Sequence, residues 1–223
     1  MEVIRHHHGL LFAADSQQSI HEQRIPSMPP RAAVRNAAAC MLRVAAIALL
    51  SAASLPIAAQ TQTPSPYSGT PMPVPATFEA EDFDRGGEGV AYHDNVKGNA
   101  GGQYRTSEDV DIIVSSDSLG GGYVVNNFET GEWLAYTVNV ATSAQYDIEL
   151  RASNGNWSPP PRFHIEIDGV NVTGSVTVPN TGSWNTFQWV GKLGVPLTAG
   201  RHVLKIVADQ QYFNLDAIQI LRN

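Results

Sequence analysis

The residues best suited to chemistry are two glutamates near the start of the strand-rich part of the chain and an aspartate near its end. Glu79 and Glu81 are two residues apart, and Asp216 closes the segment Phe213-Asn214-Leu215-Asp216. Residues i and i+2 of a strand point to the same face, so the two glutamates are expected side by side. Two like charges placed in this way need a cation between them, which predicts a metal site. If Asp216 completes the ligand set, the first and last strands must be neighbours.

The same two glutamates also admit a catalytic interpretation, because glycoside hydrolysis uses a pair of carboxyl groups. Same-face neighbours on one strand are roughly 7 Å apart, which overlaps the range of inverting enzymes. That reaction, however, requires the two groups on opposite sides of the bond to be cleaved. Adjacent side chains that point the same way do not flank a bond, so we favour the metal and expect no catalytic residue.

The elements that must position these residues are short strands separated by Gly, Pro, Asn and Asp between residues 76 and 223. Apolar and polar residues alternate in segments 133–140, 146–151, 163–168, 203–207 and 217–220. No stretch shows a sustained helical period with caps. The pattern predicts an all-β, single-domain fold, a two-sheet antiparallel β-sandwich of jelly-roll type.

Residues 1–59 are interpreted as an N-terminal extension plus a secretory signal, with a start at Met28 or Met41 and cleavage after Ala59. Arginines precede an apolar run at 44–55, and small residues follow it. The run is too short to span a bilayer. We therefore expect a secreted or extracellular protein, with the periplasm as the alternative. The single cysteine, Cys40, lies inside the signal. An exported domain without a disulfide can be stabilised by a bound metal instead.

Residues 60–75 are rich in Pro, Thr and Ser and predict an extended linker before the module at 76–223. From residue 60 onward there are nine Lys and Arg against eighteen Asp and Glu, a net charge of −9. So acidic a surface repels phosphate backbones, which argues against nucleic acid and favours neutral ligands. We expect a monomer that has no membrane partner once the signal is removed.

Five sequence motifs, in order along the module, carry a resemblance to a known family. They are 78–83 (FEAEDF), 131–138 (GEWLAYTV), 178–184 (VPNTGSW), 197–202 (LTAGRH) and 213–216 (FNLD). Together they resemble the family 6 carbohydrate-binding modules, secreted β-sandwiches usually attached to enzymes that degrade polysaccharides. The resemblance extends over nearly all of residues 77–221. It implies a structural calcium ion between the terminal strands, with Glu79, Glu81 and Asp216 as its side-chain ligands, and oxygen ligands of this kind suit calcium better than zinc.

The resemblance also implies a sugar site in the loops at one edge of the sandwich. Trp184 matches one of the two aromatic rings that flank a sugar in this family, and Asn214 matches the amide that binds its hydroxyl groups. The second ring falls at Asn127, so the site either has one platform or recruits a nearby ring. The candidates for that ring are Phe128, Tyr92 and Tyr123.

Three other aromatic or acidic positions complete the candidate residues. Trp133 and Glu166 match a second carbohydrate-binding face that some members of the family use. Trp157 precedes three prolines and is expected to pack on them.

These observations predict a non-catalytic module that binds a neutral plant or algal polysaccharide such as xylan, β-glucan or agarose. The alternatives are a fragment or divergent member of a secreted glycoside hydrolase, and an envelope adhesion module.

Overall fold

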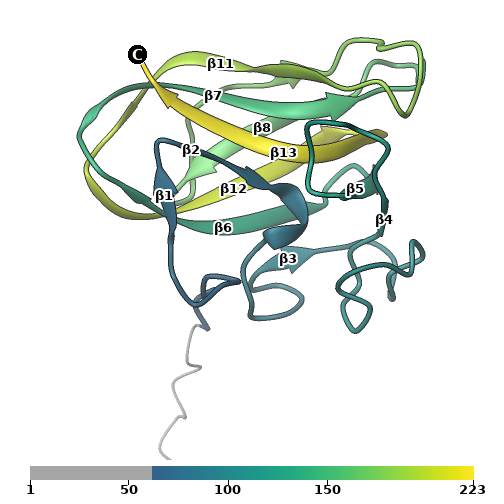
Figure 1. Cartoon of the computed structure of the whole chain (residues 1–223), viewed down its shortest axis with the longest axis horizontal. Helices are drawn as coiled ribbons and strands as arrows, with labels where there is room; N and C mark the ends of the chain where they lie inside the picture. The colour runs from purple at the N-terminus through teal and green to yellow at the C-terminus, as the bar shows by residue number, and fades with distance from the viewer. Residues whose placement is uncertain (1–61) are drawn as a thin grey trace, which may run out of the picture. The chain divides into compact units, whose positions relative to one another are not determined.

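The computed structural model describes residues 62–223. The predicted signal, the start codons, Cys40 and residues 60 and 61 lie outside the described residues. Within the described part, strands form two sheets that face each other (Figure 1). One short 3-10 helix, η1, interrupts them at Ala80–Asp82. No helix of this part is long and apolar enough to cross a membrane.

The seven-stranded sheet follows the order β1-β6-β12-β8-β10, with β3 also paired to β6 and β9 to β8. Its strands are β1 (Met72–Val74), β3 (Tyr92–His93), β6 (Trp133–Val140), β8 (Arg162–Ile167), β9 (Val170–Asn171), β10 (Val176–Thr177) and β12 (Gly200–Gln210). All of these pairings are antiparallel except β1 with β6, which is parallel.

The six-stranded sheet follows the order β11-β7-β13-β5-β4, with β2 also paired to β13. Its strands are β2 (Ala76–Glu79), β4 (Ile112–Val114), β5 (Tyr123–Phe128), β7 (Ala144–Ser153), β11 (Gln188–Leu197) and β13 (Phe213–Arg222). In Figure 1 the last strand, β13, runs between β7 and the β2 and β5 side of the sheet. The predicted two-sheet sandwich is therefore confirmed.

The core lies between the sheets and is built from the inward-facing residue of each alternating pair. On β12, for example, Leu204 and Ile206 are fully buried, whereas Lys205 between them faces outward and is half-buried. The same alternation places Phe163 and Ile165 of β8 in the core. Apolar and polar residues alternate along the strands, so the inner faces of the sheets form the core. Binding sites are therefore expected on the outer sheet faces and the connecting loops.

The structure differs from the predicted linker at residues 60–75. Met72 to Val74 form β1 against Val138 to Val140 of β6, and Val74 is buried. Ser65 and Arg85 exchange backbone hydrogen bonds of 2.9 and 2.7 Å. A proline-rich segment can pair in this way because β1 is an edge strand, where a residue without an N–H group is tolerated. The proline-rich composition of this segment does not reveal that Val74 is buried in the core.

Candidate functional site

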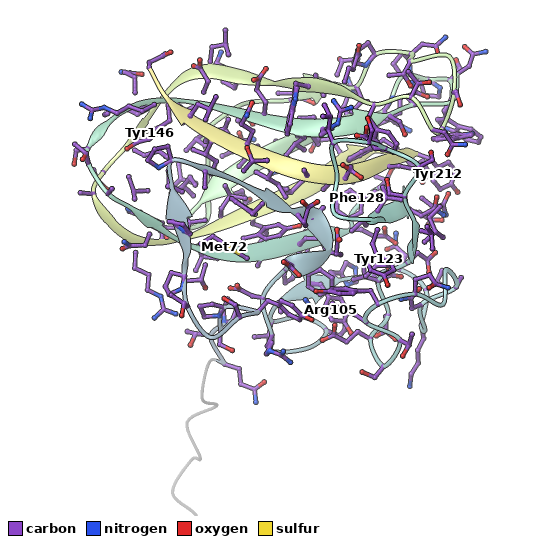
Figure 2. All side chains as sticks on the ribbon, viewed as in Figure 1. Met72, Arg105, Tyr123, Phe128, Tyr146 and Tyr212 are labelled. Carbon is purple, nitrogen blue, oxygen red and sulfur yellow. The ribbon has the colours of Figure 1, made fainter. Side chains whose placement is uncertain are left out.

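A hollow of about 420 Å³ opens among the loops at one end of the sandwich. Its residues come from the end of β5, from the loops that precede β8 and β11, and from the turn into β13. Figure 2 labels one of them, Tyr212, at this end of the molecule. The lining residues are Asn126, Asn127, Trp157, Trp184, Tyr212 and Asn214. Three of the six are aromatic and three are amides, so the hollow offers flat apolar surfaces together with hydrogen-bonding groups.

Trp184 is 37% exposed, and its ring lies against Gly155. A Cβ atom added to Gly155 would lie 2.4 Å from the indole, so only glycine permits this close packing. The Trp184 carbonyl accepts hydrogen bonds from Ser153 Oγ, at 2.7 Å, and from Asn214 Nδ2, at 3.2 Å. The ring is therefore held in place by its neighbours while much of it stays accessible in the hollow.

Asn214 is only 3% exposed, and its side-chain amide joins two parts of the hollow. Its Oδ1 accepts a hydrogen bond from the Asn127 backbone N–H at 3.1 Å, and its Nδ2 donates to the Trp184 carbonyl. An amide has four hydrogen-bonding positions, so one N–H and one lone pair remain after these two bonds. Asn214 thus positions the backbone of Trp184 and Asn127 and keeps spare capacity for a ligand.

Two aromatic residues in the hollow were not among the candidates for a second ring. The rings of Trp157 and Tyr212 meet edge to face, with centroids 4.8 Å apart, and Trp157 is 40% exposed. Trp157 therefore packs on Tyr212 and lines the hollow, which the expected packing on prolines did not anticipate. A signal for Tyr212 was present, because it lies two residues before Asn214 and such residues share a face in extended chain.

The structure does not place Phe128, Tyr92 or Tyr123 in the hollow. Phe128, labelled in Figure 2, is 2% exposed. Its ring packs edge to face on Phe213 in the core, with centroids 5.2 Å apart. Tyr92 is also buried and donates a hydrogen bond to Asp109 Oδ2 at 3.3 Å. Tyr123 packs on the ring of Tyr104. The prediction of Phe128 and Tyr92 is corrected because both rings face inward.

Trp133 and Glu166 lie on the outer face of the seven-stranded sheet, joined by a lysine. Lys205 Nζ is 4.3 Å from the Trp133 ring centroid and 3.8 Å from Glu166 Oε2. The ammonium group thus sits over the ring face that a sugar would need. Both residues thus contact Lys205 on this face, and a ligand there would have to displace that lysine.

The strand pairing that the carboxylates predicted is confirmed. β2 pairs with β13, and Glu79 lies opposite Ala217, the residue after Asp216. Strand β2 ends at Glu79, however, and Glu81 belongs to helix η1. The two glutamates are therefore not same-face neighbours on one strand, because the chain turns between them.

The loop between β4 and β5 closes over these carboxylates. Glu79 Oε2 accepts a hydrogen bond from the Gly121 backbone N–H at 3.0 Å, and Asp216 Oδ1 accepts one from Ser115 Oγ at 2.9 Å. A Cβ atom at Gly120 would lie 2.2 Å from Asp216 Oδ2, so glycine is required for this approach. Consecutive loop residues thus contact Glu79 and Asp216.

Two buried carboxylate oxygens in this region, Glu81 Oε2 and Asp216 Oδ2, have no hydrogen-bond partner. Burial, with repulsion from Glu79, Asp82 and Asp216, raises the pKa of Glu81 to about 8. Burial, with repulsion from Asp117 and Glu79, raises the pKa of Asp216 to about 6. Within residues 62–223 no three His, Cys, Asp or Glu side chains already surround one point, so the metal interpretation depends on these two oxygens. Unsatisfied acidic oxygens suit a hard cation.

Comparison with known proteins adds independent findings. The family model described as carbohydrate binding module (family 6) matches residues 100–222. A curated relative, the cycloisomaltooligosaccharide glucanotransferase of Niallia circulans, is 25% identical over 122 residues, which are 52% of this chain. The match spans only 12% of that enzyme's length.

Two solved structures are similar over most of the described residues. A carbohydrate-binding module of lichenase 5A from Cellvibrio mixtus, solved with cellotriose, is 28% identical, with a TM-score of 0.51. The match covers 67% of this chain and 98% of that one. The C-terminal module of the laminarinase LamC from Zobellia galactanivorans is 24% identical, with the same TM-score of 0.51, and covers 66% of this chain and 98% of its own. At that identity the second match supports the fold alone.

Proposed function

Because this chain belongs to carbohydrate-binding module family 6, we propose that it binds a neutral plant or algal polysaccharide, such as β-glucan, xylan or agarose, without cleaving it. The observation that carries the proposal is the loop-end hollow, where Trp157, Trp184 and Tyr212 stand beside three asparagines. The similar module of Cellvibrio mixtus was solved with cellotriose, which favours a glucan among these candidates.

The chemistry of the hollow fits an uncharged sugar. A flat indole covers the C–H face of a pyranose, and Trp184 is held in an accessible position by Gly155. Amide groups pair with adjacent hydroxyls because each carries both donors and acceptors. In this proposal Trp184 is the main platform, Trp157 and Tyr212 form a second wall, and Asn127 and Asn214 supply hydrogen bonds.

We further propose that Glu79, Glu81 and Asp216 hold a structural calcium ion. The two buried oxygens without partners support it, since a cation would satisfy both. When bound, calcium would compensate the negative charge of these two oxygens, which accept no hydrogen bond. The residues themselves join β2, helix η1 and the end of the β4–β5 loop to strand β13.

A secreted location is part of the same proposal and depends on the signal read in residues 31–59. Binding without catalysis would raise the local concentration of an associated enzyme at its substrate. The long glucanotransferase relative is consistent with a module that works beside a catalytic partner.

The alternative of a glycoside hydrolase has no support from the carboxylates that suggested it. Glu81, one of the two glutamates that suggested it, is 3% exposed, so a glycosidic bond could not reach it. An envelope adhesion module would use the same hollow to bind a cell-surface glycan. The two hypotheses differ in which glycan the protein binds.

Affinity electrophoresis in calcium tests the proposed function. Gels that contain β-glucan, xylan, agarose or mannan should show retarded migration on at least one of them, while a gel without polysaccharide serves as the reference. Reducing ends released from the retained polysaccharide should stay at background. Free migration on every gel would refute polysaccharide recognition.

Replacing Gly155 with alanine should weaken binding, although Gly155 is not among the residues proposed to contact the sugar. The added Cβ overlaps the indole of Trp184, which must swing away because the backbone behind it cannot move easily. We expect the protein to stay folded and to lose about tenfold in affinity, the equivalent of roughly 1.4 kcal/mol. Titration calorimetry measures the affinity, and a shift in tryptophan fluorescence reports the displaced ring. Unchanged affinity together with the fluorescence shift would show that Trp184 is not the platform.

A further inference from the structure

A second hollow, of about 220 Å³, lies beyond Trp157 and contains a cationic side chain. It is lined by Pro159, Pro160, Arg162 and Thr177. Arg162 is the first residue of β8 and is exposed. It points to the outer side of its sheet, because the next residue, Phe163, is buried in the core.

Chain connections place the two hollows side by side. Trp157 lines the first hollow, and Pro159, only two residues later, lines the second. On the other side of the boundary, Tyr212 lines the first hollow, and Gln210, two residues earlier, is paired with Arg162 in the sheet. The rings of Trp157 and Tyr212 are in contact, so the side of the first hollow that they form is the side from which the chain leads to the second hollow.

The guanidinium group of Arg162 has no ion pair or side-chain hydrogen bond with the rest of residues 62–223. The acidic residue next to its pairing position, Asp209, is already bonded to His164 Nδ1 at 2.6 Å and to Ser175 Oγ at 2.8 Å. By contrast, Arg105 and Arg151 are paired with Glu108 and Asp117. Arg162 thus keeps its donors for a ligand.

A carboxylate lies beside the first hollow. Glu129 Oε1 accepts a hydrogen bond from Asn127 Nδ2 at 3.4 Å, which places a carboxylate beside the amides of that hollow. A negatively charged sugar is therefore disfavoured in the first hollow, which favours a neutral sugar there.

We propose that the second hollow is a subsite for an anionic sugar, one whose carboxylate or sulfate group pairs with Arg162 while a neutral neighbour in the same chain occupies the Trp184 hollow. Guanidinium matches either anion because its planar donors bind two oxygens at once. The inference rests on the proposed function, because a neutral sugar still occupies the Trp184 hollow, and it extends the ligand to chains that also carry acidic substituents. The proline rings supply apolar surface beneath the sugar.

Three versions of one oligosaccharide test the subsite. The neutral oligosaccharide comes from whichever polysaccharide retards the protein most, and its partners carry a carboxylate or a sulfate ester at the primary alcohol. Titration in low salt should show the anionic versions binding about twofold to fivefold more tightly than the neutral one, the range of an exposed ion pair. The gain should disappear at high salt. The affinities of the two anionic versions show whether the subsite prefers the carboxylate or the sulfate.

Arg162→Gln should remove the gain and leave the affinity for the neutral oligosaccharide unchanged. Arg222→Gln is the matched control, because it removes the same charge at the far end of β13 and should keep the gain. Equal binding of neutral and anionic versions by the wild type would overturn the subsite alone. A gain that survives Arg162→Gln, or an equal loss for all three oligosaccharides, would also overturn it. If no polysaccharide is bound at all, the proposed function fails first and the subsite falls with it.

Discussion

Replacing Trp184 with alanine should reduce polysaccharide affinity by about thirtyfold or more, the equivalent of roughly 2 kcal/mol, which is typical of an aromatic residue at the centre of a binding site. The indole is the ring of the hollow that is backed by the Gly155 backbone and held through its own carbonyl by Ser153 and Asn214. Because it is ordered before a ligand arrives, little binding energy is spent on fixing it. Calorimetry on the retained polysaccharide measures the loss.

The same substitution should cost little stability. Trp184 is 37% exposed and does not belong to the buried core, so we expect the free energy of unfolding to fall by no more than about 1 kcal/mol. Trp189→Ala is the matched control: that ring lies half-buried on β11 with Arg151 5.7 Å from its centroid, outside the hollow. The control should keep its affinity. A strongly lowered melting temperature for Trp184→Ala would mean that the ring is a packing residue.

The parts of the site that the sequence predicts are those set by strand order. Asp216 on the last strand and Glu79 on an early one implied neighbouring strands, and β2 does pair with β13. Alternation located the strands because each buries one face. Trp184 and Asn214 were found through a family resemblance, and the structure places them in one hollow.

The missed parts depend on how loops meet. Trp157 and Tyr212 are 55 positions apart in the sequence, and their contact exists only because the loops before β8 and β13 converge. The position expected for the second ring, Asn127, has a positive φ of 58°, so the strand turns away there and its neighbour Phe128 enters the core. Local pattern carries no information about either event. The turn at η1, which separates Glu79 from Glu81, was missed for the same reason.

Removing calcium should lower the melting temperature by about 5–10 °C. An ion present at a hundred times its dissociation constant adds about 2.7 kcal/mol to stability, and each kcal/mol shifts the melting of a domain of this size by about 2–4 °C. Differential scanning calorimetry in calcium and in chelator measures the shift. Glu81→Gln and Asp216→Asn should abolish it, whereas Glu149→Gln, on β7 of the same sheet, should retain it. Identical melting curves with and without chelator would refute a bound structural ion.

The dependence on pH gives a second readout of the same site. In chelator, the folded protein holds Glu81 with a pKa of about 8, against its usual 4.5, and Asp216 with a pKa of about 6, against 3.8. The folded state therefore binds more protons than the unfolded state between these values, and its stability falls as the pH rises from about 4 to 8. Bound calcium replaces those protons, so the decline should be smaller in calcium. Burial also raises the pKa of Glu132 to about 7, which lowers stability over the same range with or without the ion. The difference between the two curves is thus the informative quantity.

Chelation should leave sugar binding largely intact at low temperature, and this separates the ion's role from that of the hollow. Asp216 and Asn214 are two residues apart on β13, but Asn214 is held by its own hydrogen bonds to Asn127 and Trp184, which do not involve the carboxylates. Loss of the ion would act on Glu81 Oε2 and Asp216 Oδ2, the two oxygens without partners, rather than on the hydrogen bonds of Asn214. We therefore expect affinity measured well below the melting temperature to change less than threefold. A larger loss in the still-folded protein would mean that the ion positions Asn214 directly, and that the two sites form one unit.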